Sequence, residues 1–176
     1  VIPLLQFIFE QLYAVGIRDY CFVVGREKRS IEDHFTPDET YLNELSRKHN
    51  ILMTNFYKRL EKSHLIWTNQ NKPLGFGDAV KRSEKYIGSD NFIVHGGDVS
   101  IIGKSKHPVL RLIKTAKDDP SIAAVLLCKK ITDPKRYGVP QVKKISSSTY
   151  LVEKVEEKPN KPKSNLGILP IYFFRP

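Results

Sequence analysis

The chain has 176 residues, of which 40% are hydrophobic and 27% are charged, a balance typical of a single soluble globular domain with a full hydrophobic core. Charged or polar residues interrupt every apolar run before it could form a membrane-spanning helix, and the first ten residues lack the features of a secretion signal. We therefore expect a cytoplasmic protein without a membrane partner, and the net charge of +10 favours a polyanionic partner no more than a plain solvated surface.

Alternating helices and strands are predicted for most of the chain. Apolar residues recur at helical spacing near the N-terminus, and short β-rich runs end at glycine or polar residues. Thr36 or Asp38 is expected to cap a helix. The alternation predicts an α/β protein with a parallel sheet. In chain order we expect a helix over 4–15, a strand over 19–24, a helix over 26–35, a helical segment over 41–62 broken near 49–50, a strand over 64–68, a helix over 78–87, a strand over 92–95, a helix over 107–117 and a strand over 122–128.

The pattern changes after Tyr137. Short strands are expected over 140–145, 149–155 and 165–174, with a charged, proline-rich stretch over 156–163. No linker is long enough to separate two domains. The sequence starts on a helix at Val1 and stops just after a strand, so we expect it to omit parts of a longer protein at the front and at the back.

Asp98 is the first candidate for a ligand-binding residue. In open α/β sheets ligands bind outside the carboxyl ends of the strands, and Gly96-Gly97-Asp98 directly follows a predicted strand. The glycines let a phosphate approach the backbone, and Mg²⁺ is normally held by one or two carboxylates together with substrate phosphates. Spacing alone slightly favours the alternative that Asp98 caps a turn.

Three weaker signals lie elsewhere in the chain. Gln70 follows a strand and carries both a donor and an acceptor, as needed to read a pyrimidine edge. The loop 73–77 precedes a helix, so its free amides could meet a polar ligand. Glu157 and Lys158 place an acid beside a base, but adjacent side chains of a strand face opposite ways, so the pair needs a bend that Pro159 would supply. Taken singly, a surface glutamine, a loop junction and a solvated turn explain these signals better.

Other reactive side chains show no functional pattern. The histidines lack the spacing of a zinc site, and no Ser, Cys or Lys stands in a recognisable nucleophile motif. Cys21 and Cys128 lie in apolar runs and are interpreted as structural.

The signals occur together in an order that resembles the sugar-1-phosphate nucleotidyltransferase family. The resemblance covers nearly the whole chain and is greatest to the prokaryotic UTP–glucose-1-phosphate uridylyltransferase branch, which residues 25–35 resemble in particular. It implies a Rossmann-like mixed, mostly parallel sheet flanked by helices, the nucleotide-diphospho-sugar transferase fold. The other segments that carry it are 3–10, 14–19, the base-recognition segment 70–80, Gly97-Asp98, Tyr137-Gly138-Val139, Glu157-Lys158-Pro159 and Ser164-Asn165-Leu166.

The resemblance also implies a reaction, in which the uridylyl group of UTP is transferred to glucose 1-phosphate to give UDP-glucose and pyrophosphate. Asp98 would hold Mg²⁺, and Lys158 would neutralise the sugar phosphate, so that both take part in catalysis. The nucleotide-binding residues would be Gln70, Pro73, Gly75, Gly97 and Asp98, and the sugar-phosphate-binding residues would be Gly138, Glu157, Lys158 and Asn165. Residues 1–176 would form one incomplete nucleotidyltransferase domain, with a nucleotide-binding part over 1–130 and a sugar-phosphate-binding part over 131–176.

The sequence departs from the family pattern at several points. A glycine-rich nucleotide-binding loop expected before Pro3 and a second metal-binding aspartate expected after the last strand are absent from it, so the sequence as it stands is expected to be inactive. Asp78 stands where the uridylyltransferase branch usually has His, and Pro170 is an extra proline. These departures leave open a dTTP-using glucose-1-phosphate thymidylyltransferase and a non-catalytic relative that binds nucleotide-sugars.

Nucleic-acid binding would also explain the positive charge. The sequence shows no helix-turn-helix, zinc-finger or RNA-recognition signature, so we expect no nucleic-acid partner. Relatives of this branch commonly assemble, and we expect a homodimer or homotetramer.

Overall fold

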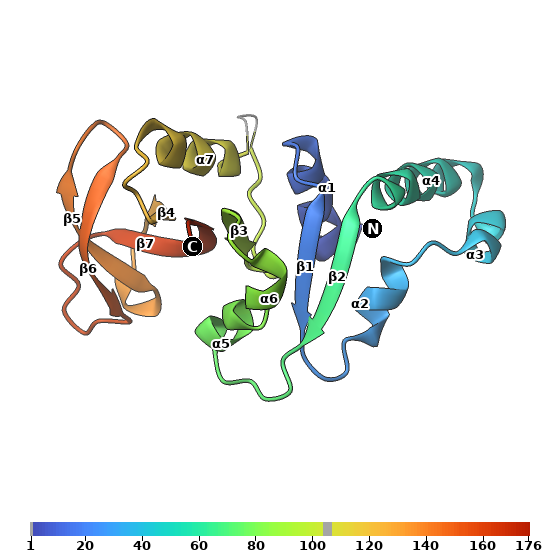
Figure 1. Ribbon diagram of the computed structural model, residues 1–176, viewed down its shortest axis with the longest axis horizontal. Coiled ribbons are helices and arrows are strands. Elements are labelled where there is room, and N and C mark those ends of the chain that lie inside the picture. Colours follow the sequence, from blue (N-terminus) through green and yellow to red (C-terminus); the bar gives the residue numbers. More distant parts are fainter. Residues whose placement is uncertain (1, 104–106) are drawn as a thin grey trace. The chain divides into compact units, whose positions relative to one another are not determined.

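The computed structural model describes residues 2–103 and 107–176, which form two compact units (Figure 1). The first unit contains the described residues up to Asn91, together with 100–103, His107 and Pro176. The second contains Phe92–Val99 and Pro108–Arg175. No helix in the described part of the chain is long and apolar enough to cross a membrane. The expected division at residue 130 separates a nucleotide-binding part from a sugar-phosphate-binding part. It concerns ligand binding rather than packing, and it stays a prediction.

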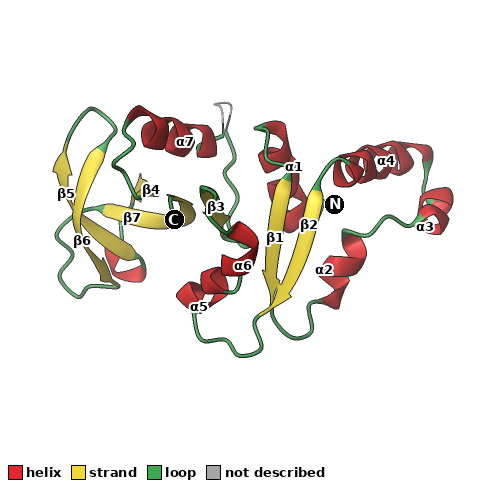
Figure 2. Ribbon diagram, in the orientation of Figure 1, coloured by secondary structure: helices red, strands yellow, loops and turns green. Residues whose placement is uncertain are grey.

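The first unit combines helices with one pair of parallel strands (Figure 2). Strands β1 and β2 pair in register from Asp19↔His64 to Val24↔Asn69. Parallel strands need a long crossover, which here runs through three helices. The elements of the unit are α1 (Leu4–Ala14), β1 (Asp19–Val24), α2 (Arg29–His34), α3 (Glu39–Glu44), α4 (Arg47–Glu61), β2 (His64–Asn69), α5 (Phe76–Lys81) and α6 (Glu84–Ile87).

The junction between α3 and α4 confirms one expectation and corrects another. Asp38 caps α3, because its side chain accepts a hydrogen bond from the backbone N–H of Tyr41 at 3.0 Å. The break falls at Leu45 and Ser46 rather than near Asn50, since Leu45 has extended backbone angles. Asn50 continues α4, and its Nδ2 donates to the carbonyl of Leu42 at 2.7 Å. The polar residue expected to end a helix therefore ties two helices together.

Aromatic side chains form the core of the first unit. Phe9 and Phe56 are buried and meet edge to face, with ring centroids 5.8 Å apart. Phe22 and Trp67 stack across the strand pair at 4.4 Å. Such ring pairs add to the apolar area that their side chains bury, so this cluster fixes α1 and α4 against the two strands.

A chain of polar contacts borders this core. His34 Nε2 donates to Gln6 Oε1 at 2.8 Å, and Gln6 Nε2 donates to Glu10 Oε1 at 3.1 Å. Glu10 in turn pairs with Arg59 at 3.0 Å. Gln6 is buried, so these bonds supply the partners that its amide would otherwise lack. Burial lowers the pKa of His34, which favours the neutral ring in the folded protein.

The second unit is built around strand β7. β7 lies between β3 and β4 and is antiparallel to both, while β5 and β6 form a separate antiparallel pair. Helix α7 packs on this sheet through Val109, Leu112 and Ala116, which are buried. The elements are β3 (Phe92–His95), α7 (Val109–Asp118), β4 (Ala124–Lys130), the 3₁₀ helix η1 (Pro134–Arg136), β5 (Gly138–Lys144), β6 (Tyr150–Glu157) and β7 (Leu166–Phe174).

The strand pairing confirms a mixed α/β fold but corrects the expectation of a mostly parallel sheet. β1 and β2 are parallel, whereas the other pairs among the described strands are antiparallel. β3 and β4 run in the same direction, yet β7 separates them. An apolar run such as that of β7 indicates burial on both faces but carries no information on strand direction. The sequence therefore predicts the strands and not their partners.

The two cysteines behave as structural side chains. Cys21 in β1 and Cys128 in β4 are free and half-buried. Burial raises the pKa of both thiols, to about 11 for Cys128. Thiolate formation near neutral pH is thereby suppressed, which agrees with the structural interpretation.

Candidate nucleotide and sugar-phosphate sites

In the first unit, the predicted base-recognition residues lie where β2 ends. The backbone N–H of Gln70 donates to the carbonyl of Val24 at 2.8 Å and so extends the parallel strand pair by one residue. The Gln70 side chain turns to the following loop, where Nε2 donates to the carbonyl of Gly75 at 3.0 Å. Gly75 has φ 103° and ψ 178°, angles that are open essentially to glycine alone. The structure thus brings Gln70 and Gly75 together, and their role in holding the base stays a prediction.

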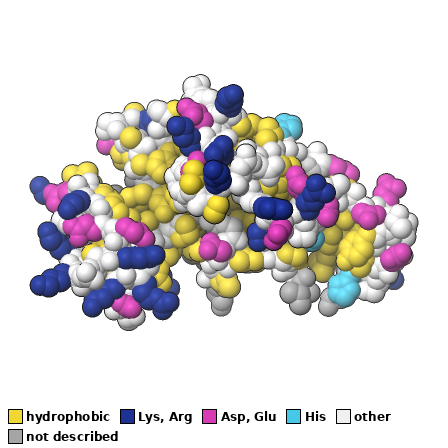
Figure 3. Space-filling view, turned by 90° about the horizontal axis from the view of Figure 1, so that it is seen from below, with side chains coloured by type: hydrophobic (Ala, Val, Ile, Leu, Met, Phe, Trp, Pro, Cys, Tyr) yellow, Lys and Arg dark blue, Asp and Glu magenta, His cyan; other side chains and the backbone are white. Residues whose placement is uncertain are grey.

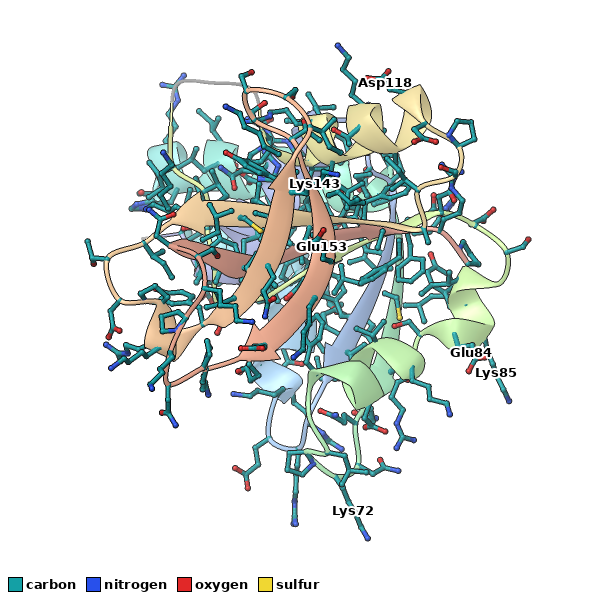
Figure 4. All side chains as sticks on the ribbon, turned by 90° about the vertical axis from the view of Figure 1, so that its left-hand side faces the viewer. Lys72, Glu84, Lys85, Asp118, Lys143 and Glu153 are labelled. Atoms are coloured by element: carbon teal, nitrogen blue, oxygen red, sulfur yellow. The ribbon has the colours of Figure 1, made fainter. Side chains whose placement is uncertain are left out.

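Pro73 lies in the exposed part of the same loop. Lys72 beside it extends away from the ribbon (Figure 4), and Leu74 is 67% exposed. No described residue packs these side chains into a core, which suits a loop that meets a ligand. The role of Pro73 in nucleotide binding stays a prediction.

Asp78 is the residue that sequence reasoning missed in this segment. Gln70 Nε2 also donates to Asp78 Oδ2 at 2.9 Å, and Arg82 Nη2 lies 3.3 Å from Asp78 Oδ1. The hydrogen bond from Gln70, assisted by those from Arg82, lowers the pKa of Asp78. The sequence marked Asp78 only as a departure from the family pattern. The contact depends on the backbone angles of Gly75, so no pattern in the sequence could have revealed it.

In the second unit, Asp98 follows β3 as predicted and is exposed to solvent. Among the described residues none donates a hydrogen bond to its carboxylate, and no ion pair forms with it, so the structure does not show the turn-capping alternative. A group of three or more potential metal-ligating side chains is likewise absent from the described part of the chain. Mg²⁺ held by Asp98 would take its remaining ligands from phosphate oxygens and water, which is usual for this ion.

Pro170 supports the loop that carries Asp98. Its carbonyl accepts a hydrogen bond from the N–H of Gly96 at 2.7 Å, and a Cβ added to Gly96 would lie 2.9 Å from Pro170 Cγ and 3.1 Å from Asp98 Oδ1. A side chain at position 96 would therefore clash with the Pro170 ring and crowd Asp98, which favours glycine there.

A distortion of β7 makes room for this proline. Leu126 of β4 pairs with Tyr172, but Cys128 pairs with Ile168, so β7 carries extra residues between them, Pro170 included. Proline has no N–H for a central strand, and a bulge removes that requirement. Pro170, which departs from the family pattern, is thus the residue that packs against Gly96, two residues before Asp98.

Gly138, Glu157 and Lys158 meet at one end of the β5–β6 pair. Gly138 is the register partner of Glu157, and a Cβ at Gly138 would lie 3.2 Å from Glu157 Oε2. The Lys158 backbone N–H donates to the carbonyl of Tyr137 at 3.0 Å. Glycine at position 138 therefore gives the Glu157 carboxylate its room.

The acid and the base of this group lie close to each other. Lys158 Nζ lies 3.8 Å from Glu157 Oε1, and the two side chains are 65% and 72% exposed. The bend that permits this lies at Lys158 itself, with φ 46°, rather than at Pro159. A left-handed residue other than glycine costs about 1–3 kcal/mol and is typical of functional sites.

Asn165 directly precedes β7 in the same unit. Its carbonyl accepts a hydrogen bond from the N–H of Ile131 at 2.9 Å, and its side chain is exposed. The neighbouring Ser164 Oγ donates to the carbonyl of Pro140 at 2.8 Å. These bonds tie the beginning of β7 to β4 and β5, and so place Asn165 on the strand group that includes Gly138.

The surroundings of this second group are basic. Lys and Arg outnumber Asp and Glu over residues 129–163, and Figure 3 shows basic side chains gathered over β5 and β6. Exposed cations attract a negatively charged, phosphorylated ligand from solution. The predicted sugar-phosphate residues thus lie on the more basic unit, together with Asp98 and Gly97.

Comparison with known proteins finds a matching family model and similar curated proteins. The model of the nucleotidyl transferase family matches residues 1–176. UTP–glucose-1-phosphate uridylyltransferase 2 of Streptococcus pyogenes serotype M3 is 31% identical over 182 residues, which cover 99% of this chain and 60% of that protein. The chain thus spans about 60% of the length of this curated relative.

Solved structures show the same fold. A UDP-glucose pyrophosphorylase complexed with UDP-glucose superposes with a TM-score of 0.85 at 23% identity, over 99% of this chain and 64% of that one. A UTP-bound UGPase from Acinetobacter baumannii superposes with a TM-score of 0.84 at 24% identity, over 98% and 63%. Because the family model matches this chain from residue 1 to residue 176, the chain belongs to the nucleotidyl transferase family.

Proposed function

We propose that the protein containing this chain transfers the uridylyl group of UTP to glucose 1-phosphate. A phosphate oxygen of glucose 1-phosphate forms a bond to the α-phosphorus of UTP, the bond from that phosphorus to the β-phosphate bridging oxygen breaks, and pyrophosphate leaves with the electron pair. UDP-glucose is the other product. The similarity to a uridylyltransferase and to structures holding UTP and UDP-glucose supports this choice of substrates.

The observation that carries the proposal is the Glu157–Lys158 pair. A strained backbone at Lys158 presents an ammonium and a carboxylate side by side in solvent, in a unit rich in positive charge. Little covalent chemistry falls to the protein in such transfers, so positioning and charge neutralisation carry the catalysis. Lys158 neutralises the sugar phosphate, and Glu157 accepts hydrogen bonds from sugar hydroxyls. Gly138 and Asn165 complete this pocket.

Asp98 is the residue that would hold Mg²⁺. Its carboxylate is exposed and makes no hydrogen bond or ion pair with a described residue. Gly97 beside it is also exposed, which leaves its backbone open to phosphate. When bound, the ion neutralises charge on the reacting phosphates. Asp98 would fix the position of the ion, while Gln70, Pro73 and Gly75 would hold the base.

A turnover assay tests the proposal. The full protein is incubated with glucose 1-phosphate, Mg²⁺ and each nucleoside triphosphate in turn, and pyrophosphate release is measured. Turnover with UTP is expected. Turnover with dTTP in its place would identify a thymidylyltransferase, and binding without turnover would identify a non-catalytic relative.

Two variants test the assigned residues. Asp98→Ala and Lys158→Ala should each lower turnover by about a hundred-fold or more while the protein stays folded. Lys143→Ala is the matched control, because Lys143 is an exposed lysine on β5 (Figure 4) that has no role in the proposed site. Near-normal turnover in either test variant removes that residue from the mechanism.

A further inference from the structure

The side-chain amide of Gln70 has a fixed orientation. An amide nitrogen carries two hydrogens, and here both have acceptors, the carbonyl of Gly75 at 3.0 Å and Asp78 Oδ2 at 2.9 Å. The reversed amide would place its oxygen against a carbonyl and a carboxylate, neither of which can donate a hydrogen bond. The surrounding hydrogen bonds therefore determine the positions of Oε1 and Nε2 of Gln70.

The same two bonds decide what Gln70 can offer a ligand. Its donors are used inside the protein, and among the described residues none donates to its Oε1. Gln70 is half-buried, and Oε1 is not among the enclosed polar atoms without a partner. The side chain therefore presents an acceptor to a bound base and no donor.

Asp78 is itself held in place. It lies in α5, which begins directly after Gly75, and Arg82 one turn later pairs with its other oxygen at 3.3 Å. The Gly75 carbonyl also accepts from the N–H of Ala79 at 3.2 Å, the first bond of the helix. Both acceptors of the Gln70 amide thus belong to one rigid turn of helix. The low pKa of Asp78 keeps the carboxylate ionised, and so unable to donate, at neutral pH.

We propose that Asp78 determines base specificity by fixing the Gln70 amide so that it accepts from a ring N–H. The proposal rests on the proposed role of Gln70 in holding the base. Uracil and thymine carry an N–H between two carbonyl groups, and cytosine has an unprotonated nitrogen at that position. A fixed acceptor therefore favours uracil or thymine over cytosine, because an acceptor facing an acceptor leaves both without a partner.

Nucleotide affinities measure this effect directly. The dissociation constants of UTP and CTP are determined by titration calorimetry with Mg²⁺ for the full protein and for Asp78→Ala. The wild-type protein should bind UTP about ten- to a hundred-fold more tightly than CTP. Without Asp78 only the Gly75 carbonyl still opposes a reversed amide. The amide can then reverse more easily and donate to cytosine, so the ratio should fall by about three-fold or more, mainly through tighter binding of CTP.

Two further variants make the result specific. Asp78→Asn should also lower the ratio, since an asparagine amide can face either orientation of Gln70, and it serves if Asp78→Ala does not fold. Glu84→Ala on α6 (Figure 4) removes a carboxylate outside the site and should keep the wild-type ratio. A purely structural role for Asp78 would weaken UTP and CTP equally and leave the ratio unchanged.

The outcomes separate the two proposals. If the wild-type protein binds neither nucleotide, the proposed function fails and the inference falls with it. If the wild-type protein binds UTP and CTP equally, or if both Asp78 variants keep the wild-type preference, the inference is overturned while the nucleotide-binding function stands.

Discussion

The two candidate sites use polar side chains in opposite ways. Around Gln70 the hydrogen bonds of the amide nitrogen are internal, because the Gly75 carbonyl and the Asp78 carboxylate accept both of its hydrogens. Around Lys158 and Asp98 the charged groups are exposed, with 3.8 Å between the ammonium of Lys158 and the Glu157 carboxylate, while the backbone beneath them is strained or closely packed. A neutral base is best selected by hydrogen bonds of fixed geometry. A phosphate and a metal ion are better held by charges that a rigid backbone leaves free.

The largest effect is expected from Lys158→Gly. Glycine adopts φ 46° without strain, so the free energy of unfolding should stay the same or rise by up to about 1 kcal/mol, while loss of the ammonium lowers turnover about a hundred-fold or more. Urea unfolding and pyrophosphate release measure the two quantities. Lys161→Gly, in the same basic stretch, should not affect turnover. Destabilisation by Lys158→Gly would contradict the strain at this position.

Gly75→Ala should break the internally bonded region. Nothing lies within 4 Å of the added Cβ, so the cost comes from the backbone angles alone, at about 1–3 kcal/mol of unfolding free energy. The Gln70 amide would lose its carbonyl partner if the loop relaxed, and UTP should bind more weakly. Gly25→Ala, also with free space but without a positive φ, is the matched control. Equal stability of the two variants would show that Gly75 is not strained.

Gly138→Ala should disturb the sugar-phosphate site alone, because it displaces the Glu157 carboxylate. Its Cβ would crowd Glu157 Oε2 at 3.2 Å, and the exposed carboxylate can shift by a small amount. We expect KM for glucose 1-phosphate to rise about ten-fold, the cost of one disturbed hydrogen bond to a charged group, with KM for UTP unchanged. A rise in KM for UTP instead would contradict the assignment of Gly138 to the sugar-phosphate pocket.

Gly96→Ala tests the support of Asp98 from β7. The Cβ would meet the Pro170 ring at 2.9 Å, so the variant should lose about 1–3 kcal/mol of unfolding free energy. Pro170→Gly removes the ring, and the double variant should regain part of that loss. A double-mutant cycle from urea unfolding gives the coupling, and purely additive effects would show that the two residues do not press on each other.

The smallest effect concerns His34 and acid stability. Burial places its folded-state pKa below the unfolded value of 6.5. The neutral ring therefore contributes stability in full above that unfolded value, and the contribution is lost as pH falls through the folded-state pKa. Urea unfolding is measured from about pH 7.5 to about pH 5, the range in which histidine titrates. The free energy of unfolding should decrease over this range, and the decrease should be smaller in His34→Gln. An unchanged slope in the variant would assign the decrease to other groups.

Local features of the fold were predictable from the sequence, whereas pairing was not. The Asp38 cap and the position of β3 follow from residue type and apolar run length. The insertion of β7 between β3 and β4 is a long-range choice that an apolar run does not encode. The predicted helix break near Asn50 is wrong, because the side chain of Asn50, a poor helix former, donates a hydrogen bond to the Leu42 carbonyl and the residue stays helical.

The candidate sites show the same division. Asp98 after two glycines, and the acid–base pair before Pro159, are visible as short motifs. The contacts of Asp78 and Pro170 are not, because each depends on backbone geometry that neighbouring glycines permit. In the sequence both residues stand out only as departures from a family pattern. The structure shows that Asp78 binds Gln70 and that Pro170 binds Gly96.

The central place of β7 also has a consequence for folding during synthesis. β3 and β4 leave the ribosome before Leu166 does, and neither can form its ladder until β7 follows. Contacts between residues so far apart in the chain form slowly, and unpaired strand edges invite association with other chains. A ribosome that stalls before Leu166 would therefore release a second unit with two open edges, a substrate for chaperones rather than a folded domain.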